Sequence, residues 1–171
     1  GKWKTNKNGS YYAAGVRSQV AGRGANIALL DDVMSEEDSF SQTGRKYIKE
    51  WYPAGLRTRL MPNGSIVIIN TRYHYDDLCG WLLKQEKTAE QSTYPWEVIS
   101  IPAWLNEEAA ELLDLPVGGS YFPEWKTDEI LRIDEQDIRA SNGARYWNSL
   151  YMQDPSPDDG GIIKKKYIQW W

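Results

Sequence analysis

The chain has 171 residues, which is the size of one ordinary domain and too short for two large ones. A hydrophobic fraction of 41% and a charged fraction of 26% exclude collagen-like, low-complexity and disordered chains. The net charge of −4 gives no global electrostatic reason to expect a nucleic acid or membrane partner. One cysteine, Cys79, and one histidine, His74, exclude an internal disulfide and a cysteine-rich zinc site. Without a long apolar run or a signal peptide at the start, the chain reads as cytosolic.

The apolar segments predict a mixed α/β fold. Weak alternation over residues 9–16 indicates a strand or hairpin arm. Short continuous apolar runs at 27–30 and 66–69 predict strands buried on both faces, and alternation over 96–101 predicts a third strand. Between the first two strands, the aromatic and apolar positions of residues 40–52 fall on one face of a helix. This order of strand, helix and strand favours a parallel crossover.

Capping and breaking residues place the helix ends. Ser35 and Ser39 are the candidate N-caps of the helix over 40–52, and Pro53 is expected to end it. A second, short helix is expected to open at Asp76–Asp77. Residues 106–130 are expected to be rich in loops. Residues 134–153 read as a helix that is broken or kinked at Asn142–Gly143.

Polar residues follow both apolar strands, at the carboxyl ends where open α/β sheets bind ligands. Asp31 and Asp32 end the first strand. Two carboxylates there are typical of nucleoside triphosphatases, in which one holds Mg²⁺ and the next activates the attacking water. Asn70, Thr71 and Arg72 follow the second strand, where the Thr71 hydroxyl can contact a γ-phosphate or its water. The simpler alternative is that these residues only cap turns and helices.

A flexible arginine precedes the acidic strand. Arg23 stands between Gly22 and Gly24, and this mobile loop would let the guanidinium reach a phosphate held by a neighbouring subunit, as an arginine finger does. The alternative is a turn with a solvated arginine. Gly1–Lys2 does not complete a phosphate-binding loop, because Trp3 stands where Ser or Thr must bind Mg²⁺.

Two other charged groups were weighed as sites. Asp76 and Asp77 are better explained as helix caps than as the metal ligands of a nuclease, which needs carboxylates from several elements. Lys164–Lys166 with Trp170 and Trp171 can contact nucleic acid, although a solvated edge before an interface is the simpler interpretation.

Four stretches together resemble the large terminase subunit of tailed bacteriophages, the motor that pumps DNA into the prohead. They are residues 22–32, 51–52 with 56–60, 66–78, and 146–155 with 160–161. The resemblance implies a partial P-loop NTPase-type three-layer fold with a mainly parallel sheet that lacks the phosphate-loop strand. It assigns residues 1–153 to the second half of the ATPase domain and 154–171 to a linker toward a nuclease domain.

The same resemblance implies roles for the strand-end residues. Asp31–Asp32 takes the Walker B position, and Asn70–Thr71 takes the position of the coupling motif that links hydrolysis to DNA movement. Arg23 lies near the place where some members carry a trans-acting arginine.

Two residues depart from the family's pattern. The family usually has Glu after the magnesium Asp, so the catalytic base is either Asp32 or one of Glu36 and Glu37. Asn70 stands where Gly or another small residue is common.

The implied function is that of an ATP-hydrolysing motor using Mg²⁺ and ATP. Its partners would be double-stranded viral DNA, the portal protein, the small terminase subunit and further copies in a ring, in the host cytoplasm at the prohead. The phosphate-binding loop and the nuclease cluster are not among the 171 residues, so we expect a piece of a larger subunit that is inactive alone. The alternatives are a stand-alone protein-interaction module and, less favoured, a metal-dependent nuclease.

Overall fold

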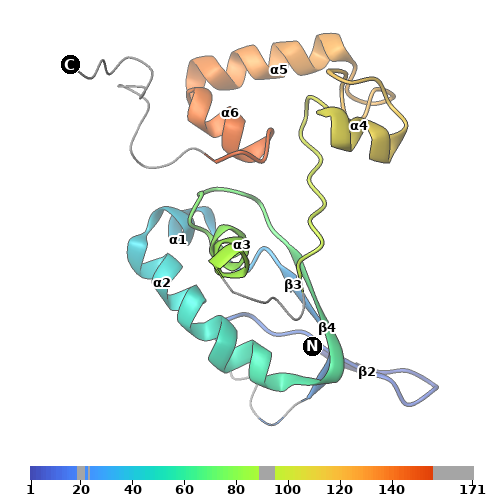
Figure 1. Ribbon diagram of the computed structural model, residues 1–171, viewed down its shortest axis with the longest axis vertical. Coiled ribbons are helices and arrows are strands. Elements are labelled where there is room, and N and C mark those ends of the chain that lie inside the picture. The colour runs from blue at the N-terminus through green and yellow to red at the C-terminus, as the bar shows by residue number, and fades with distance from the viewer. Residues whose placement is uncertain (19–21, 23, 89–94, 156–171) are drawn as a thin grey trace. The chain divides into compact units, whose positions relative to one another are not determined.

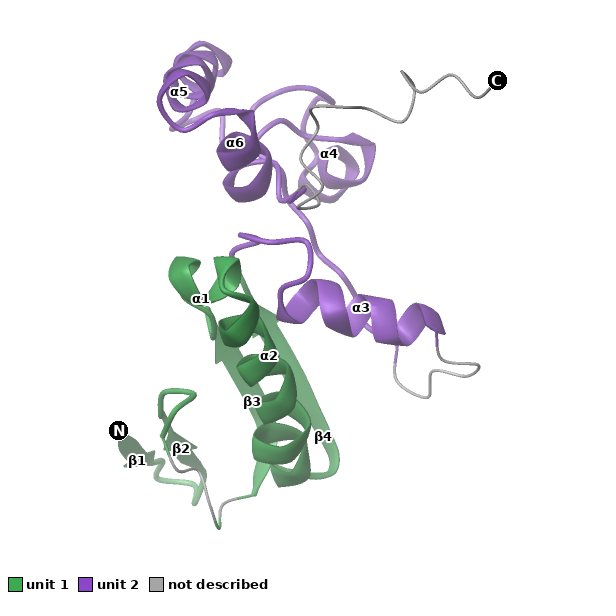
Figure 2. Cartoon of the chain, turned by 90° about the vertical axis from the view of Figure 1, so that its left-hand side faces the viewer, with its two compact units in different colours: residues 1–70 green, residues 71–171 purple. Residues whose placement is uncertain are grey.

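The computed structural model describes residues 1–18, 22, 24–88 and 95–155. The chain divides into two compact units, residues 1–70 and residues 71–171 (Figure 2). The chain contains both strands and helices, as expected of an α/β protein. Within the described residues, no helix is long and apolar enough to cross a membrane.

The first unit holds an antiparallel hairpin and a parallel strand pair. β1 (Lys2–Lys4) pairs with β2 (Ser10–Tyr12) in the hairpin. β3 (Ala25–Asp31) pairs in parallel with β4 (Leu60–Ile69), and the two are joined through helices, which confirms the expected parallel crossover. In both views α2 runs alongside this strand pair (Figures 1 and 2).

The crossover contains two α-helices where the sequence predicts one. They are α1 (Glu36–Phe40) and α2 (Gln42–Trp51). The Ser35 hydroxyl caps α1, and the Ser41 hydroxyl caps α2 by accepting from the Gly44 N–H at 3.2 Å. The prediction that Ser39 caps a helix is wrong, since it is buried in α1 and its hydroxyl donates to the Ser35 carbonyl at 2.8 Å. The extended backbone of Ser41 makes the break.

Gly44 lets the two helices meet closely. A Cβ at this position would lie 2.5 Å from the Asp38 carbonyl oxygen, closer than real contacts allow. α2 ends at Trp51 as Pro53 predicts, but the chain continues through a π-helical turn (Tyr52–Leu56) and a 3₁₀ turn (Arg57–Arg59) before β4.

The strand pair is covered on one face only within the described residues. Ala28 and Leu30 of β3 are buried, whereas Ile27 and Leu29 are 69% and 56% exposed. Their neighbours on β4 follow the same alternation, with Val67 and Ile69 exposed. The prediction that both strands are buried on both faces is therefore wrong for this chain, because the helices found in the described residues of the first unit all come from the crossover.

The second unit is helical. Its helices are α3 (Leu78–Thr88), α4 (Glu107–Leu113), α5 (Asp128–Ser141) and α6 (Ala144–Leu150). The predicted break at Asn142–Gly143 is confirmed, although α5 begins six residues before the expected start at 134. α4, capped by Asn106, lies inside the region expected to be loops.

Among its described residues, this unit has an apolar cluster around Trp147 and another beside α4. One centres on Trp147, which is fully buried with Ala103 and Leu131, and whose ring stacks on Tyr151 at 4.5 Å. The other joins Leu105 to Ala109 and Ala110 of α4.

The third strand expected over residues 96–101 does not form. This segment has no strand partner in the described part of the chain, and Val98 and Ile99 are exposed. The Gln153 side chain donates to the Ile101 carbonyl and accepts from the Ser100 hydroxyl, so side-chain contacts replace a sheet ladder here.

Candidate functional site at the carboxyl ends of β3 and β4

The parallel pairing brings the acidic strand end beside the end of β4. Asp31 pairs with Ile69, and the Asp32 N–H donates to the Ile69 carbonyl at 3.0 Å. Asn70 follows Ile69 directly, so Asp31, Asp32 and Asn70 share one edge of the strand pair, as the sequence predicts. The edge exists because both apolar runs stop at polar residues in the same register.

Asp32 has an unusual backbone conformation. Its φ of 40° lies in the left-handed region, which Asp and Asn adopt more readily than other residues with a side chain. Asp31 precedes it on the open face of β3, the face that also carries Ile27 and Leu29. Asp31 and Asp32 are both exposed residues.

The carboxylates at this edge could bind a hard cation such as Mg²⁺ only if a bound ligand supplied further oxygen atoms. Mg²⁺ prefers oxygen ligands and is commonly held by one or two carboxylates together with water and phosphate oxygens. Within the described residues, no group of three or more acidic, histidine or cysteine side chains could hold a metal. Asp31 and Asp32 therefore fit Mg²⁺ that arrives with a phosphate group, not a closed protein site.

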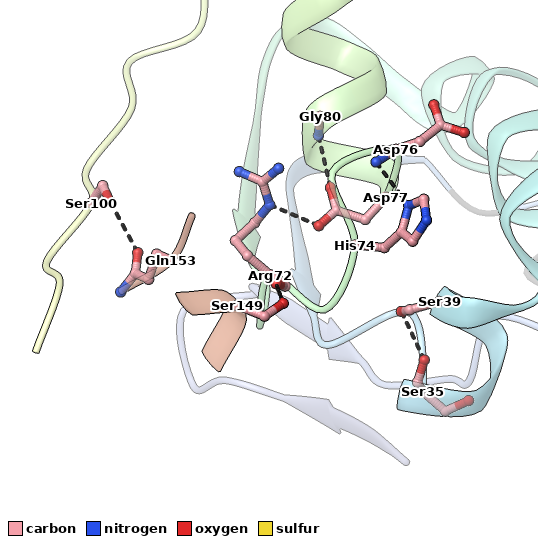
Figure 3. A network of polar contacts seen from close by, with 10 residues as sticks. All are labelled: Ser35, Ser39, Arg72, His74, Asp76, Asp77, Gly80, Ser100, Ser149 and Gln153. Carbon is pink, nitrogen blue, oxygen red and sulfur yellow. Dashed lines mark hydrogen bonds and ion pairs between the residues drawn. The ribbon is translucent and has the colours of Figure 1, made fainter. Parts of the chain in front are cut away.

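Arg72 is anchored by contacts that the sequence did not predict (Figure 3). Its Nε donates to the Asp77 carboxylate at 2.7 Å, and the Ser149 hydroxyl of α6 donates to its carbonyl. The Asp77 side chain is fully buried, whereas 21% of the Arg72 side chain remains exposed. Thr71 stands between this anchored residue and Asn70. No motif signals an Arg–Asp pair five residues apart, so sequence reasoning missed it.

Asp77 also opens α3. Its second carboxylate oxygen accepts from the Gly80 N–H at 2.8 Å, in the first turn of the helix. This confirms the capping role predicted for Asp77 and does not favour it as a metal ligand, because both oxygens are already bonded. Next to it, the Asp76 N–H donates to Nδ1 of the buried His74 at 2.9 Å (Figure 3).

Cys79 lies beside this ion pair. Burial, and secondarily the Asp77 charge, raise the pKa of the Cys79 thiol to about 11. A thiol held protonated in this way is a poor nucleophile at neutral pH, so the geometry does not favour catalysis by Cys79.

Other predicted candidates contribute less to the site. Glu36 and Glu37 occupy the exposed first turn of α1, where carboxylates interact favourably with the positive end of the helix dipole. Gly22 adopts a φ of 75°, as a tight loop requires, but Arg23 lies outside the described residues. The lysine run 164–166 with Trp170 and Trp171 also lies outside them.

A scan against protein-family models and a search of curated proteins each found no match to this chain.

Proposed function

We propose that the chain is part of an ATP-hydrolysing motor of the large terminase subunit type, which translocates double-stranded viral DNA into a prohead. One observation carries the proposal: Asp31, Asp32 and Asn70 share the carboxyl edge of two parallel strands joined by a helical crossover. The order of the four resembling stretches supports it, although Asp32 and Asn70 depart from the family's usual residues at the two strand ends.

In this function the strand-end residues have separate tasks. Asp31 holds Mg²⁺, and Asp32 orients and deprotonates the attacking water, with Glu36 and Glu37 as alternative bases. Asn70 and Thr71 contact the γ-phosphate or its water and transmit hydrolysis to DNA movement.

The arginines would stabilise negative charge. On this proposal Arg72, which belongs to the second unit and is ion-paired with Asp77, binds nucleotide, and Arg23 serves the nucleotide of a neighbouring copy. The phosphate-binding loop itself must come from residues outside this chain.

The open apolar face of the strand pair is consistent with a three-layer P-loop NTPase-type fold. Parallel sheets are normally covered on both faces, so exposed Ile27, Leu29, Val67 and Ile69 suit strands that belong to a larger, three-layer P-loop-type sheet. On this proposal the further partners are the portal protein, the small subunit and other copies in a ring, at the prohead in the host cytoplasm.

The same face supports a second candidate, a protein-interaction module without catalysis. An exposed apolar patch is typical of protein-binding surfaces, and there the carboxylates would only end a strand. The coding region before Gly1 separates the two: an in-frame phosphate-binding loop there favours the motor, and a start codon immediately before the Gly1 codon favours the module.

The decisive experiment measures Mg²⁺-dependent ATP turnover in the protein extended by that upstream segment. Asp32→Asn removes a charge without changing shape, and the expected loss of turnover is at least about 100-fold for a general base. Asp114→Asn is the matched control, because Asp114 is also exposed and also has a positive φ, of 54°. Asp31→Ala is expected to abolish turnover while the protein stays folded. Normal turnover in the Asp31 variant would overturn the assignment.

A further inference from the structure

The basic residues of the chain are unevenly distributed. The first 30 residues contain five basic residues and no acidic one, although the whole chain has a net charge of −4. Three of the five, Lys2, Lys4 and Lys7, lie in the β1–β2 hairpin, whose residues 1–15 are all exposed. A cationic ribbon therefore stands on an otherwise acidic protein.

The pairing of the hairpin sorts its side chains onto two faces. Lys2 lies opposite Tyr12 and Lys4 lies opposite Ser10, so these four side chains share one face. Every one of them can donate a hydrogen bond, and none carries a negative charge. The lysines stand two residues apart, about 7 Å along the strand.

The other face carries an aromatic pair. Trp3 lies opposite Tyr11, and their rings stack at 4.7 Å with an interplanar angle of 27°. A two-stranded ribbon is only marginally stable by itself, and a cross-strand aromatic pair adds stability. This pair therefore holds the register that keeps Lys2 and Lys4 on one face.

We propose that the lysine face of the hairpin binds the phosphate backbone of double-stranded nucleic acid. Phosphate oxygens are charged acceptors, which matches a face on which two lysine ammonium groups and two hydroxyls can all donate. A two-stranded β-ribbon is also of a size that the major groove of a duplex admits. Because the rest of the chain is acidic, repulsion elsewhere on the surface favours approach through the hairpin.

The arrangement of the two faces favours a duplex over other anionic partners. A single strand is bound largely by stacking bases on aromatic rings, but Trp3 and Tyr11 stack on each other and lie opposite the lysine face. A membrane-binding hairpin would direct its aromatic rings and its lysines to the same interface. The inference does not depend on the ATPase assignment, and its test needs no ATP.

The test is fluorescence anisotropy of a labelled DNA duplex titrated with the full chain at increasing salt. Phosphate contacts by Lys2 and Lys4 on this face and by Lys7 in the turn between the strands predict a slope of log affinity against log salt of about −3, which is about a 40-fold loss between roughly 50 and 200 mM. The variant K2Q/K4Q/K7Q is expected to lose this salt-dependent binding, and K2R/K4R/K7R is expected to keep it.

The matched control removes the same charge from exposed helical lysines, as K46Q/K84Q/K87Q. Binding within about threefold of the parent by this control supports a local patch. Equal losses in the control and hairpin variants would overturn the proposal, because only net charge would then matter. Tighter binding to the corresponding single strand, or to phosphatidylcholine vesicles containing phosphatidylserine, would also overturn it.

Discussion

Asp77 is the residue whose removal should most clearly reveal what holds the start of the second unit together. Its carboxylate is fully buried and contacts the Arg72 guanidinium at 2.7 Å and the Gly80 N–H at 2.8 Å. Asp77→Asn keeps an oxygen for the Gly80 N–H but removes the charge that Arg72 needs. Asp77→Ala removes both contacts, so the two variants separate the ion pair from the helix cap.

The magnitudes follow from burial. Removing one partner of a buried ion pair costs about 3–5 kcal/mol, and partial exposure of Arg72 places this case near the lower end. Loss of a helix cap adds about 1 kcal/mol. We therefore expect Asp77→Ala to lower the free energy of unfolding by about 4 kcal/mol, and Asp77→Asn by about 3 kcal/mol.

The assay is urea unfolding followed by circular dichroism, together with amide hydrogen exchange in α3. Hydrogen exchange is needed because the chain has two units, and a transition in one can mask the other. Asp137→Asn in α5 is the control, since Asp137 is exposed and its variant should stay within about 0.5 kcal/mol of the parent. A double-mutant cycle with Arg72→Met should give a coupling of about 2 kcal/mol. Coupling near zero would refute the reasoning.

Alkylation of Cys79 by iodoacetamide at pH 8 should be about 100-fold slower than for a thiol of ordinary pKa, and Asp77→Asn should speed it, because the Asp77 charge helps to raise the Cys79 pKa. The unfolded chain loses the thiol proton near pH 9 and the folded chain near pH 11, so the free energy of unfolding should fall as pH rises through this window. Cys79→Ala should reduce that fall, and burial of Tyr52, which raises the pKa of its hydroxyl, contributes a fall of the same sign. Trp147→Ala should cost about 4 kcal/mol in urea unfolding, because Trp147 is fully buried against Tyr151. Trp125→Ala should cost under about 0.5 kcal/mol, because Trp125 is 65% exposed, and similar costs for the two would contradict the described core.

The sequence predicts the strand pair and its acidic edge because the signals there are short and local. Continuous apolar runs fix β3 and β4, and the polar residues that end each run place Asp31 and Asn70 at one edge once the strands are parallel. Parallel pairing follows in turn from the helical length of the connection.

The errors arise where structure depends on contacts distant in sequence. Alternation over residues 96–101 suits a strand, but a strand requires a partner, and this segment is held by Gln153 instead. Helical periodicity over 40–52 is insensitive to a single extended residue, so the break at Ser41 was missed. The Arg72–Asp77 pair is a different case: it is local, forming in the segment that leads into α3, but no sequence motif signals a pair at this spacing.

The open face of the strand pair disagrees with the prediction that both strands are buried on both faces. The four side chains Ile27, Leu29, Val67 and Ile69 are each about half exposed or more. Covering them completely would contribute about 3–7 kcal/mol, at about 1.5–3 kcal/mol for each fully buried side chain. This range overlaps the whole stability of a typical domain, about 5–15 kcal/mol. The apolar residues of β3 and β4 alternate between a covered face and an open face. Their composition is therefore that of a strand whose two faces are both covered. That composition supports the proposal that β3 and β4 belong to a larger sheet, in which Asp31 would lie at the margin of a covered face.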